Sequence, residues 1–122
     1  MTAFRALAFS VAVFPSFALA ATPAEIERLY QALGTPEVVE ILHQEGLEQG
    51  REMRDDIFGE AGGPASWMGD IQAIYRIETM QKTIRTELAK QIGDTDVTPL
   101  LAFLESEDGQ QVIRLEVEAR RA

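Results

Sequence analysis

Residues 35–58 read TPEVVEILHQEGLEQGREMRDDIF, and this stretch decides the fold class. It opens with Thr35-Pro36, a typical helix start, because Pro at the first helical position needs no backbone N–H there. Apolar and small residues then recur every three or four positions, which predicts one amphipathic helix to about residue 58. This row consists of Val39, Leu42, Gly46, Gly50, Met53 and Ile57.

Further helices are expected on both sides of this stretch. The breaker-rich residues 59–64 precede a second long helix at 66–92, where apolar residues keep helical spacing. Shorter helices are expected at 22–33 and 98–104, and a final helix still has a helical pattern at Ala122. No segment alternates as a strand would. The sequence therefore predicts an all-α bundle of about five helices, built on a long antiparallel hairpin of 35–58 and 66–92. The N-terminal and two C-terminal helices should cover its apolar face.

The first twenty residues read as a secretory signal peptide. Arg5 supplies the positive charge, residues 6–14 form a short apolar stretch, and Ala18 and Ala20 offer small residues before a cleavage site at Ala21. The apolar stretch is far shorter than the ~20 residues of a membrane-spanning helix. We therefore predict a leader at 1–20, one helical domain at 21–122, a periplasmic location and no transmembrane span after cleavage.

Composition narrows the classes of function. The chain carries 11 Lys or Arg and 20 Asp or Glu, and since Arg5 is the only charged residue of the leader, the mature net charge is −10. Nucleic acid is therefore not expected as a partner, because such binding needs clustered cations. The chain contains no Cys, which excludes disulfides and thiolate chemistry.

Candidate catalytic and metal-ligating residues are weak. His43 is the only histidine, and Leu47 stands where an HExxH helix would carry its second one. Asp94 and Asp96 lack the Gly and closing Glu of a calcium loop. We expect no catalytic residue, no metal and no cofactor, and a surface or boundary position for His43.

The best interaction candidates lie around the turn between the two long helices. Gly46 and Gly50 form a GxxxG pattern that lets a second backbone approach closely, and we favour contact with the 66–92 helix over contact with a subunit or ligand. Large apolar side chains near the turn could line a pocket or anchor a partner. These are Met53, Phe58, Trp67 and Met68, of which Trp67 is expected in the core because it shares a stripe with Ile71 and Ile74.

One C-terminal motif resembles a known family. Residues 101–110 read LAFLESEDGQ, in which Phe103, Ser106 and Gly109 match the pattern "aromatic, aromatic, x, Ser, x, x, Gly, small polar" of family 2059 of domains of unknown function; Leu104 stands where that family commonly has Tyr. The resemblance covers roughly 35–119 and implies an exported, all-helical protein of Gram-negative bacteria. It supplies no catalytic residue. Physically, Ser106 can cap the last helix, Phe103 can pack into the core, and Gly109 can allow close backbone approach.

The sequence is compatible with two functions. The leading hypothesis is a non-enzymatic periplasmic module that binds a protein partner or itself through a helical surface. The alternative is a small-molecule or lipid carrier, with a cavity between the long helices lined by the apolar residues near the turn.

Overall fold

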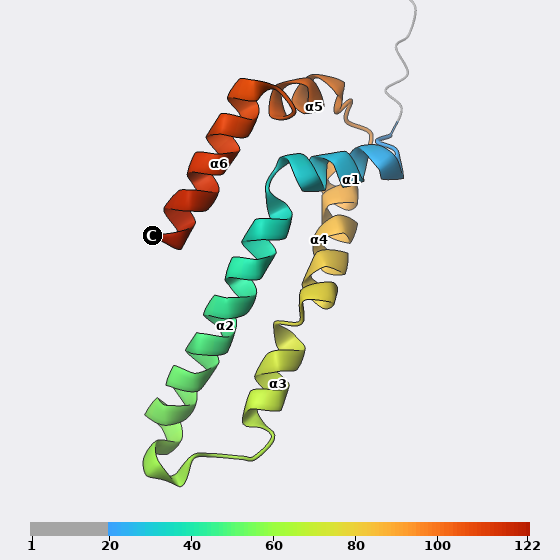
Figure 1. Ribbon diagram of the computed structural model, residues 1–122. Helices are drawn as coiled ribbons and strands as arrows, with labels where there is room; N and C mark the ends of the chain where they lie inside the picture. Colours follow the sequence, from blue (N-terminus) through green and yellow to red (C-terminus); the bar gives the residue numbers. More distant parts are fainter. Residues whose placement is uncertain (1–19) are drawn as a thin grey trace, which may run out of the picture.

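The computed structural model describes residues 20–122 and confirms the all-α fold (Figure 1). Residues 1–19, which hold most of the predicted leader, lie outside the described part. From residue 20 onward the chain forms six α-helices, one 3₁₀ turn and no strand. The helices are α1 (Pro23–Ala32), α2 (Thr35–Phe58), α3 (Trp67–Ile74), α4 (Ile77–Ile92), α5 (Thr98–Leu104) and α6 (Glu107–Arg121), with the 3₁₀ turn at Gly59–Ala61. None of these helices has the length and hydropathy of a membrane-crossing segment.

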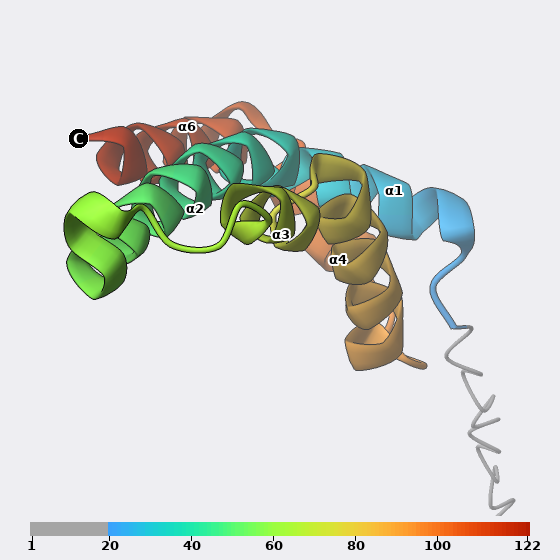
Figure 2. The same ribbon diagram turned by 90° about the horizontal axis from the view of Figure 1, so that it is seen from below.

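Helices pack over one end of the long helices, and the other end is left uncovered. In Figure 1, α2 runs downward and α3 and α4 return upward, while α1 and α5 lie across the upper end. Figure 2 shows α6, α2 and α3 side by side in one layer, with α4 turning away from them. Direct contacts join α2 to α3, α4 and α6, and join α1 to α2, α4 and α5. The lower half of α2 and α3 therefore has no second layer of helices over it.

The hydrophobic core lies at the upper end. Its centre is α1, whose Leu29 and Tyr30 are completely buried, and whose entry is fixed by the predicted capping box of Thr22 and Glu25. The other buried apolar residues are Ile26, Ala32, Val39, Ile41, Val97, Leu101 and Leu104, whereas α3 and α4 bury no residue fully. The terminal helices thus cover only one end of the long helices, and not the whole apolar face as predicted.

The predicted continuous helix at 66–92 is wrong, because it breaks at Tyr75 and Arg76. Arg76 is extended (φ −63°, ψ 125°), so α4 restarts in a new direction and reaches α1. The break leaves the Tyr75 carbonyl oxygen without a helical partner, and His43 of α2 donates its Nδ1–H to that oxygen at 2.7 Å. His43 is half-buried, so its boundary position is confirmed, and its ring nitrogen serves this contact.

Close packing of α3 on α2 depends on the two glycines of the GxxxG pattern. Both are buried, and a Cβ atom at Gly46 would overlap the ring of Tyr75. A Cβ atom at Gly50 would lie 2.5 Å from the Ile71 side chain. The missing side chains therefore let α3 approach the α2 backbone, in the intramolecular contact favoured from the sequence.

Gly50→Ala tests this packing against helix propensity. Alanine would by itself favour the helix by about 0.5–1 kcal/mol, but its Cβ must displace Ile71, which typically costs about 1–3 kcal/mol. We expect net destabilisation in urea unfolding. Gly69→Ala is the matched control, since this helical glycine of α3 faces open space and its replacement should stabilise the protein. A stabilised Gly50→Ala variant would contradict the packing.

Candidate functional site at the distal end of α2 and α3

Two apolar side chains extend the α2 packing face beyond the reach of α3. Met53 and Ile57 follow Gly50 by three and seven positions, so they lie on the same side of the helix. The start of α3 is fixed at Gly50, whose carbonyl oxygen accepts the Trp67 indole N–H at 2.8 Å. Past that point α2 is uncovered, and Met53 and Ile57 are 46% and 59% exposed.

An aromatic pair borders this exposed row. The rings of Phe58 and Trp67 pack edge to face, with centroids 5.5 Å apart and an interplanar angle of 79°. Gly63 of the connecting loop lies against the Phe58 ring. Trp67 is only half-buried, so it forms the edge of the packed region and is not the core residue expected from its stripe. We call Met53, Ile57, Phe58 and Trp67 together the distal surface.

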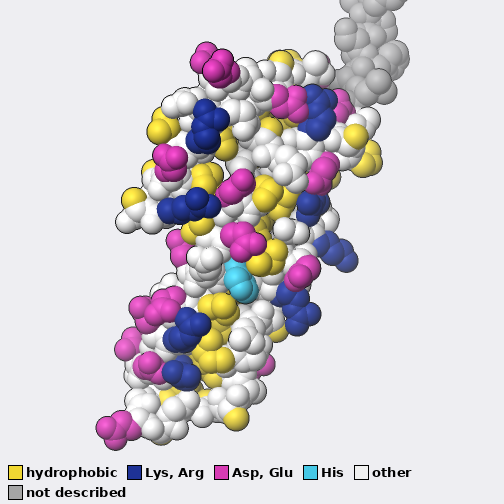
Figure 3. Space-filling view, in the orientation of Figure 1, with side chains coloured by type: hydrophobic (Ala, Val, Ile, Leu, Met, Phe, Trp, Pro, Cys, Tyr) yellow, Lys and Arg dark blue, Asp and Glu magenta, His cyan; other side chains and the backbone are white. Residues whose placement is uncertain are grey.

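Met68 and Ile74 are further large apolar side chains of α3. Met68 is half-buried and follows Trp67 in the chain. Ile74 is 63% exposed, because the helix break turns the chain just after it. In Figure 3, apolar side chains form a visible line between α2 and the α3–α4 arm, with the histidine in their midst.

Two acidic side chains lie on the same segment of α2, on the side of the helix turned away from Gly50. Glu52 and Asp56 lie four residues apart on α2, and both are exposed. The two arginines of this segment are already paired: Arg51 binds Glu48 at 2.7 Å and Arg54 binds Asp55 at 2.9 Å. Within the described residues, Glu52 and Asp56 make no ion pair, so their charges are available to a partner.

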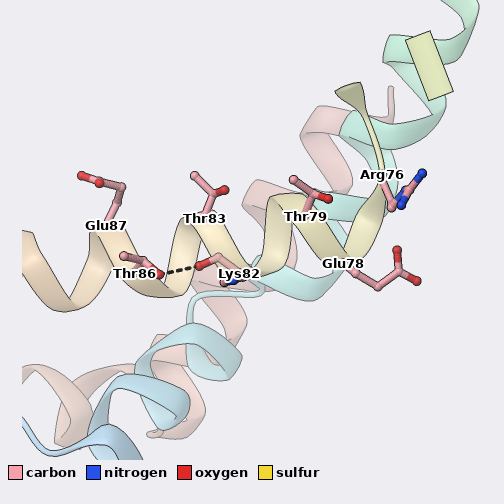
Figure 4. A pocket seen from close by; sticks show the side chains of 7 residues that line it. All are labelled: Arg76, Glu78, Thr79, Lys82, Thr83, Thr86 and Glu87. Carbon is pink, nitrogen blue, oxygen red and sulfur yellow. Dashed lines mark hydrogen bonds between the residues drawn. The ribbon is translucent and has the colours of Figure 1, made fainter. Parts of the chain in front are cut away.

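The four described hollows of the surface lie elsewhere. One open hollow follows a single polar face of α4 (Figure 4) and is lined by Arg76, Glu78, Thr79, Lys82, Thr83, Thr86 and Glu87. The Thr86 hydroxyl there donates to the backbone carbonyl of Lys82 at 2.9 Å, so it is engaged within the helix. The other three described hollows border α1, α4 and α6. None of the four is lined by the residues proposed for a carrier cavity, and no three His, Asp or Glu side chains converge within residues 20–122.

The family-like motif joins α5 to α6. Ser106 caps α6 as predicted, since its Oγ accepts the Gly109 N–H at 3.1 Å. Gly109 is buried, and a Cβ atom there would overlap the Phe103 carbonyl oxygen, so the close backbone approach is confirmed. Phe103 is 52% exposed, and its prediction as a core residue is wrong. In the short α5, Leu101 and Leu104 face the core and leave Phe103 on the outer side.

Gln110, which sequence reasoning left without a role, links two helix ends. Its side-chain amide donates to the carbonyl oxygens of Ala32 at 3.0 Å and Leu104 at 2.7 Å. These carbonyls end α1 and α5, where the helix itself provides no donor. The "small polar" position after Gly109 therefore has a physical function, because one amide supplies donors to two helix ends.

Two ion pairs bind α1 to its neighbours. Arg85 of α4 holds Glu27 with contacts of 2.7 and 3.1 Å and places its guanidinium 3.9 Å from the centre of the Tyr30 ring. Arg28 holds Glu105 at 2.8 and 2.6 Å. Hydrogen bonds from Arg85 and then Gln31 lower the pKa of Glu27 from 4.5 to about 2. Arg28 likewise lowers the pKa of Glu105.

Comparison of the chain with protein-family models, curated proteins and solved structures finds no match. The resemblance to family 2059 therefore stays a prediction from the C-terminal motif.

Gln110→Leu should destabilise the protein by about 1–3 kcal/mol, because two carbonyl oxygens at helix ends lose their donor. Gln111→Leu is the matched control, since Gln111 is exposed and only accepts a bond from Arg114. Urea unfolding of both variants measures the difference. Equal stabilities would show that the double contact contributes little.

Acid should weaken the Glu27–Arg85 pair over a defined range of pH. Because the pKa of Glu27 is lowered in the folded state, its contribution is full above about pH 4.5 and is lost as pH falls toward 2. The stability difference between wild type and Glu27→Gln, measured by urea unfolding, should shrink across that range. Glu40→Gln on α2 should show a smaller change, because Glu40 is exposed and forms no ion pair with any residue of 20–122. A constant difference for Glu27→Gln from pH 6 to pH 2 would contradict the assignment.

Proposed function

We propose that this protein is a non-enzymatic, exported module that binds another protein through the distal surface. The observation that carries the proposal is the exposed apolar row of Met53 and Ile57 on a face that, one turn earlier, is packed tightly against α3. Helical domains normally bury such a face under a second layer. A partner can supply that layer here.

The aromatic pair supports the same interpretation. Trp67 is held in place by its bond to Gly50 and by the Phe58 ring, while part of its surface stays accessible. Rigid aromatic side chains beside flexible Met are common at the energetic centre of protein interfaces. A partner would therefore meet a preformed edge and would order few side chains on binding.

The shifted pKa values favour a non-enzymatic function. Each lowered carboxyl pKa has a partner that joins helices or fixes a helix start: Arg85 for Glu27, Arg28 for Glu105, and the Thr98 backbone N–H for Asp96. Such shifts often mark catalytic groups, but each of these three carboxylates is engaged in a structural contact, including Glu27 and Glu105, which line one shared open hollow. They support a module whose charges hold the fold.

Export and location belong to the same proposal. They rest on the leader-like residues 1–20 and on the resemblance of residues 101–110 to family 2059. N-terminal sequencing of the protein from periplasm should begin at Ala21. A product that begins at Met1 would remove the periplasmic part of the proposal and leave the binding part to be tested separately.

Site-specific photo-crosslinking in intact cells tests the binding proposal. A photoreactive side chain at position 57 should give adducts heavier than the monomer, because this position lies in the distal surface. Position 115 on α6 is the matched control, since Leu115 is 55% exposed and Ile57 is 59% exposed. The same adducts from both positions, or none from position 57, would contradict the proposal, and mass spectrometry of the adduct identifies the partner.

A further inference from the structure

We infer that Met53 is a modification site, at which oxidation of the thioether to the sulfoxide weakens binding of a partner to the distal surface. The effect on binding rests on the proposed function, whereas the site of oxidation does not. The basis is the position of this methionine, which is 46% exposed and lies in the apolar row that it forms with Ile57.

Exposure distinguishes Met53 from the other methionines of residues 20–122. Met68 on α3 and Met80 on α4 are half-buried, whereas Met53 is exposed. Small oxidants reach an exposed thioether directly, while packing around a half-buried one restricts their approach. The chain contains no Cys, so no thiol of the protein competes for the oxidant. Peroxide should therefore modify Met53 first.

The reaction needs only hydrogen peroxide and the sulfur atom. The sulfur lone pair attacks one peroxide oxygen, so that an S–O bond forms and the O–O bond breaks. The sulfur is oxidised by two electrons, and the peroxide is reduced by the same two. The departing hydroxide takes the proton of the transferred oxygen, so the products are the sulfoxide and water. Methionine sulfoxide reductases reverse the change, which makes the modification reversible.

The sequence neighbours of Met53 on the α2 face show what the modification would disturb. Gly50, three positions earlier, is covered by Ile71 of α3, and Ile57, four positions later, is 59% exposed. Met53 therefore lies where the packed part of this face ends and the exposed part begins. A polar group at this position interrupts the apolar row. The proposed export would also place the side chain in an oxidising compartment.

A sulfoxide at position 53 changes the surface without reaching the core. It replaces a flexible apolar side chain with a polar one, whose oxygen accepts hydrogen bonds from water. A partner that covers the row would have to bury that oxygen, and burial of an unpaired polar group opposes binding. The core around α1 does not include Met53, so the fold should keep its stability.

Graded oxidation of the purified protein tests the site. Peptide mapping by mass spectrometry after brief peroxide treatment should find the added oxygen on Met53 several-fold sooner than on Met68 or Met80. In urea-unfolded protein, where burial is lost, the three rates should become similar. Urea unfolding of protein oxidised at Met53 should match that of unmodified protein. Three equal rates in the folded protein, or faster oxidation of Met68 or Met80, would overturn the inference.

Photo-crosslinking from position 57 tests the effect on binding. The adduct yield with peroxide is divided by the yield without it for each variant, so no variant has to bind as the wild type does. This ratio should fall several-fold for the wild type and for Met80→Leu. It should change little for Met53→Leu, which has an apolar side chain of similar volume but no sulfur. Methionine sulfoxide reductase, added to an oxidised periplasmic extract before irradiation, should restore the wild-type adducts.

The outcomes separate the inference from the proposed function. An equal fall of the ratio for the wild type and Met53→Leu, or no fall for the wild type, would overturn the effect on binding and leave the distal surface as the proposed binding site. No adduct from position 57 before oxidation would overturn the proposed function and the effect on binding together. Peptide mapping would in that case still decide whether Met53 is the site of oxidation.

Discussion

Burial of one face of the ten-residue helix α1 is the constraint on which the rest of the structure depends. Leu29 and Tyr30 are fully buried, and α1 contacts α2, α4 and α5, so it connects segments from both halves of the chain. The Tyr30 hydroxyl has no hydrogen-bond partner among the described residues, and burial raises the pKa of this phenol. An unpaired buried hydroxyl opposes folding. Packing of the ring, with the Arg85 guanidinium 3.9 Å from its centre, must therefore outweigh that cost.

Local signals in the sequence predicted those features that depend on neighbouring residues. The Thr22 capping box, the Ser106 cap and the extent of α2 need only residues within one helix, and all are observed. The break at Tyr75 could not be read in this way. Ile74, Ile77 and Ile84 keep helical spacing across it, while the donor that compensates the broken helix, His43, lies 32 positions away from Tyr75 in the chain. Sequence periodicity shows which face of a helix is apolar. It does not show where a side chain distant in the chain supplies the hydrogen bond that a helix break leaves unmade.

The roles of the candidate residues could likewise be predicted where they depend on one helix, and not where they depend on segments far apart in the chain. Gly46 and Gly50 were recognised because a missing side chain on a helix face is visible in the sequence, and the structure packs Tyr75 and Ile71 against them. Gln110 was missed, since its function requires that the ends of α1 and α5 meet, 78 and 6 positions from it. Phe103 was misplaced because α5 is only seven residues long, and such a short helix buries one narrow row and exposes the rest.

The buried core and the exposed distal surface lie in different parts of the molecule. The core that joins α1 to Val97 and α5 contains no residue of α3 or of the lower part of α2. Opening of α3 from α2 would thus expose Gly46, Gly50 and Trp67 without disturbing that core, and segments with few buried contacts open at lower free energy than the core does. The distal end of α2 and α3 can consequently open locally while α1 keeps the fold intact. A layer of helices that is anchored at one end leaves exposed, at the other end, the face that a second layer would cover, and this exposed face is where we propose that a partner binds.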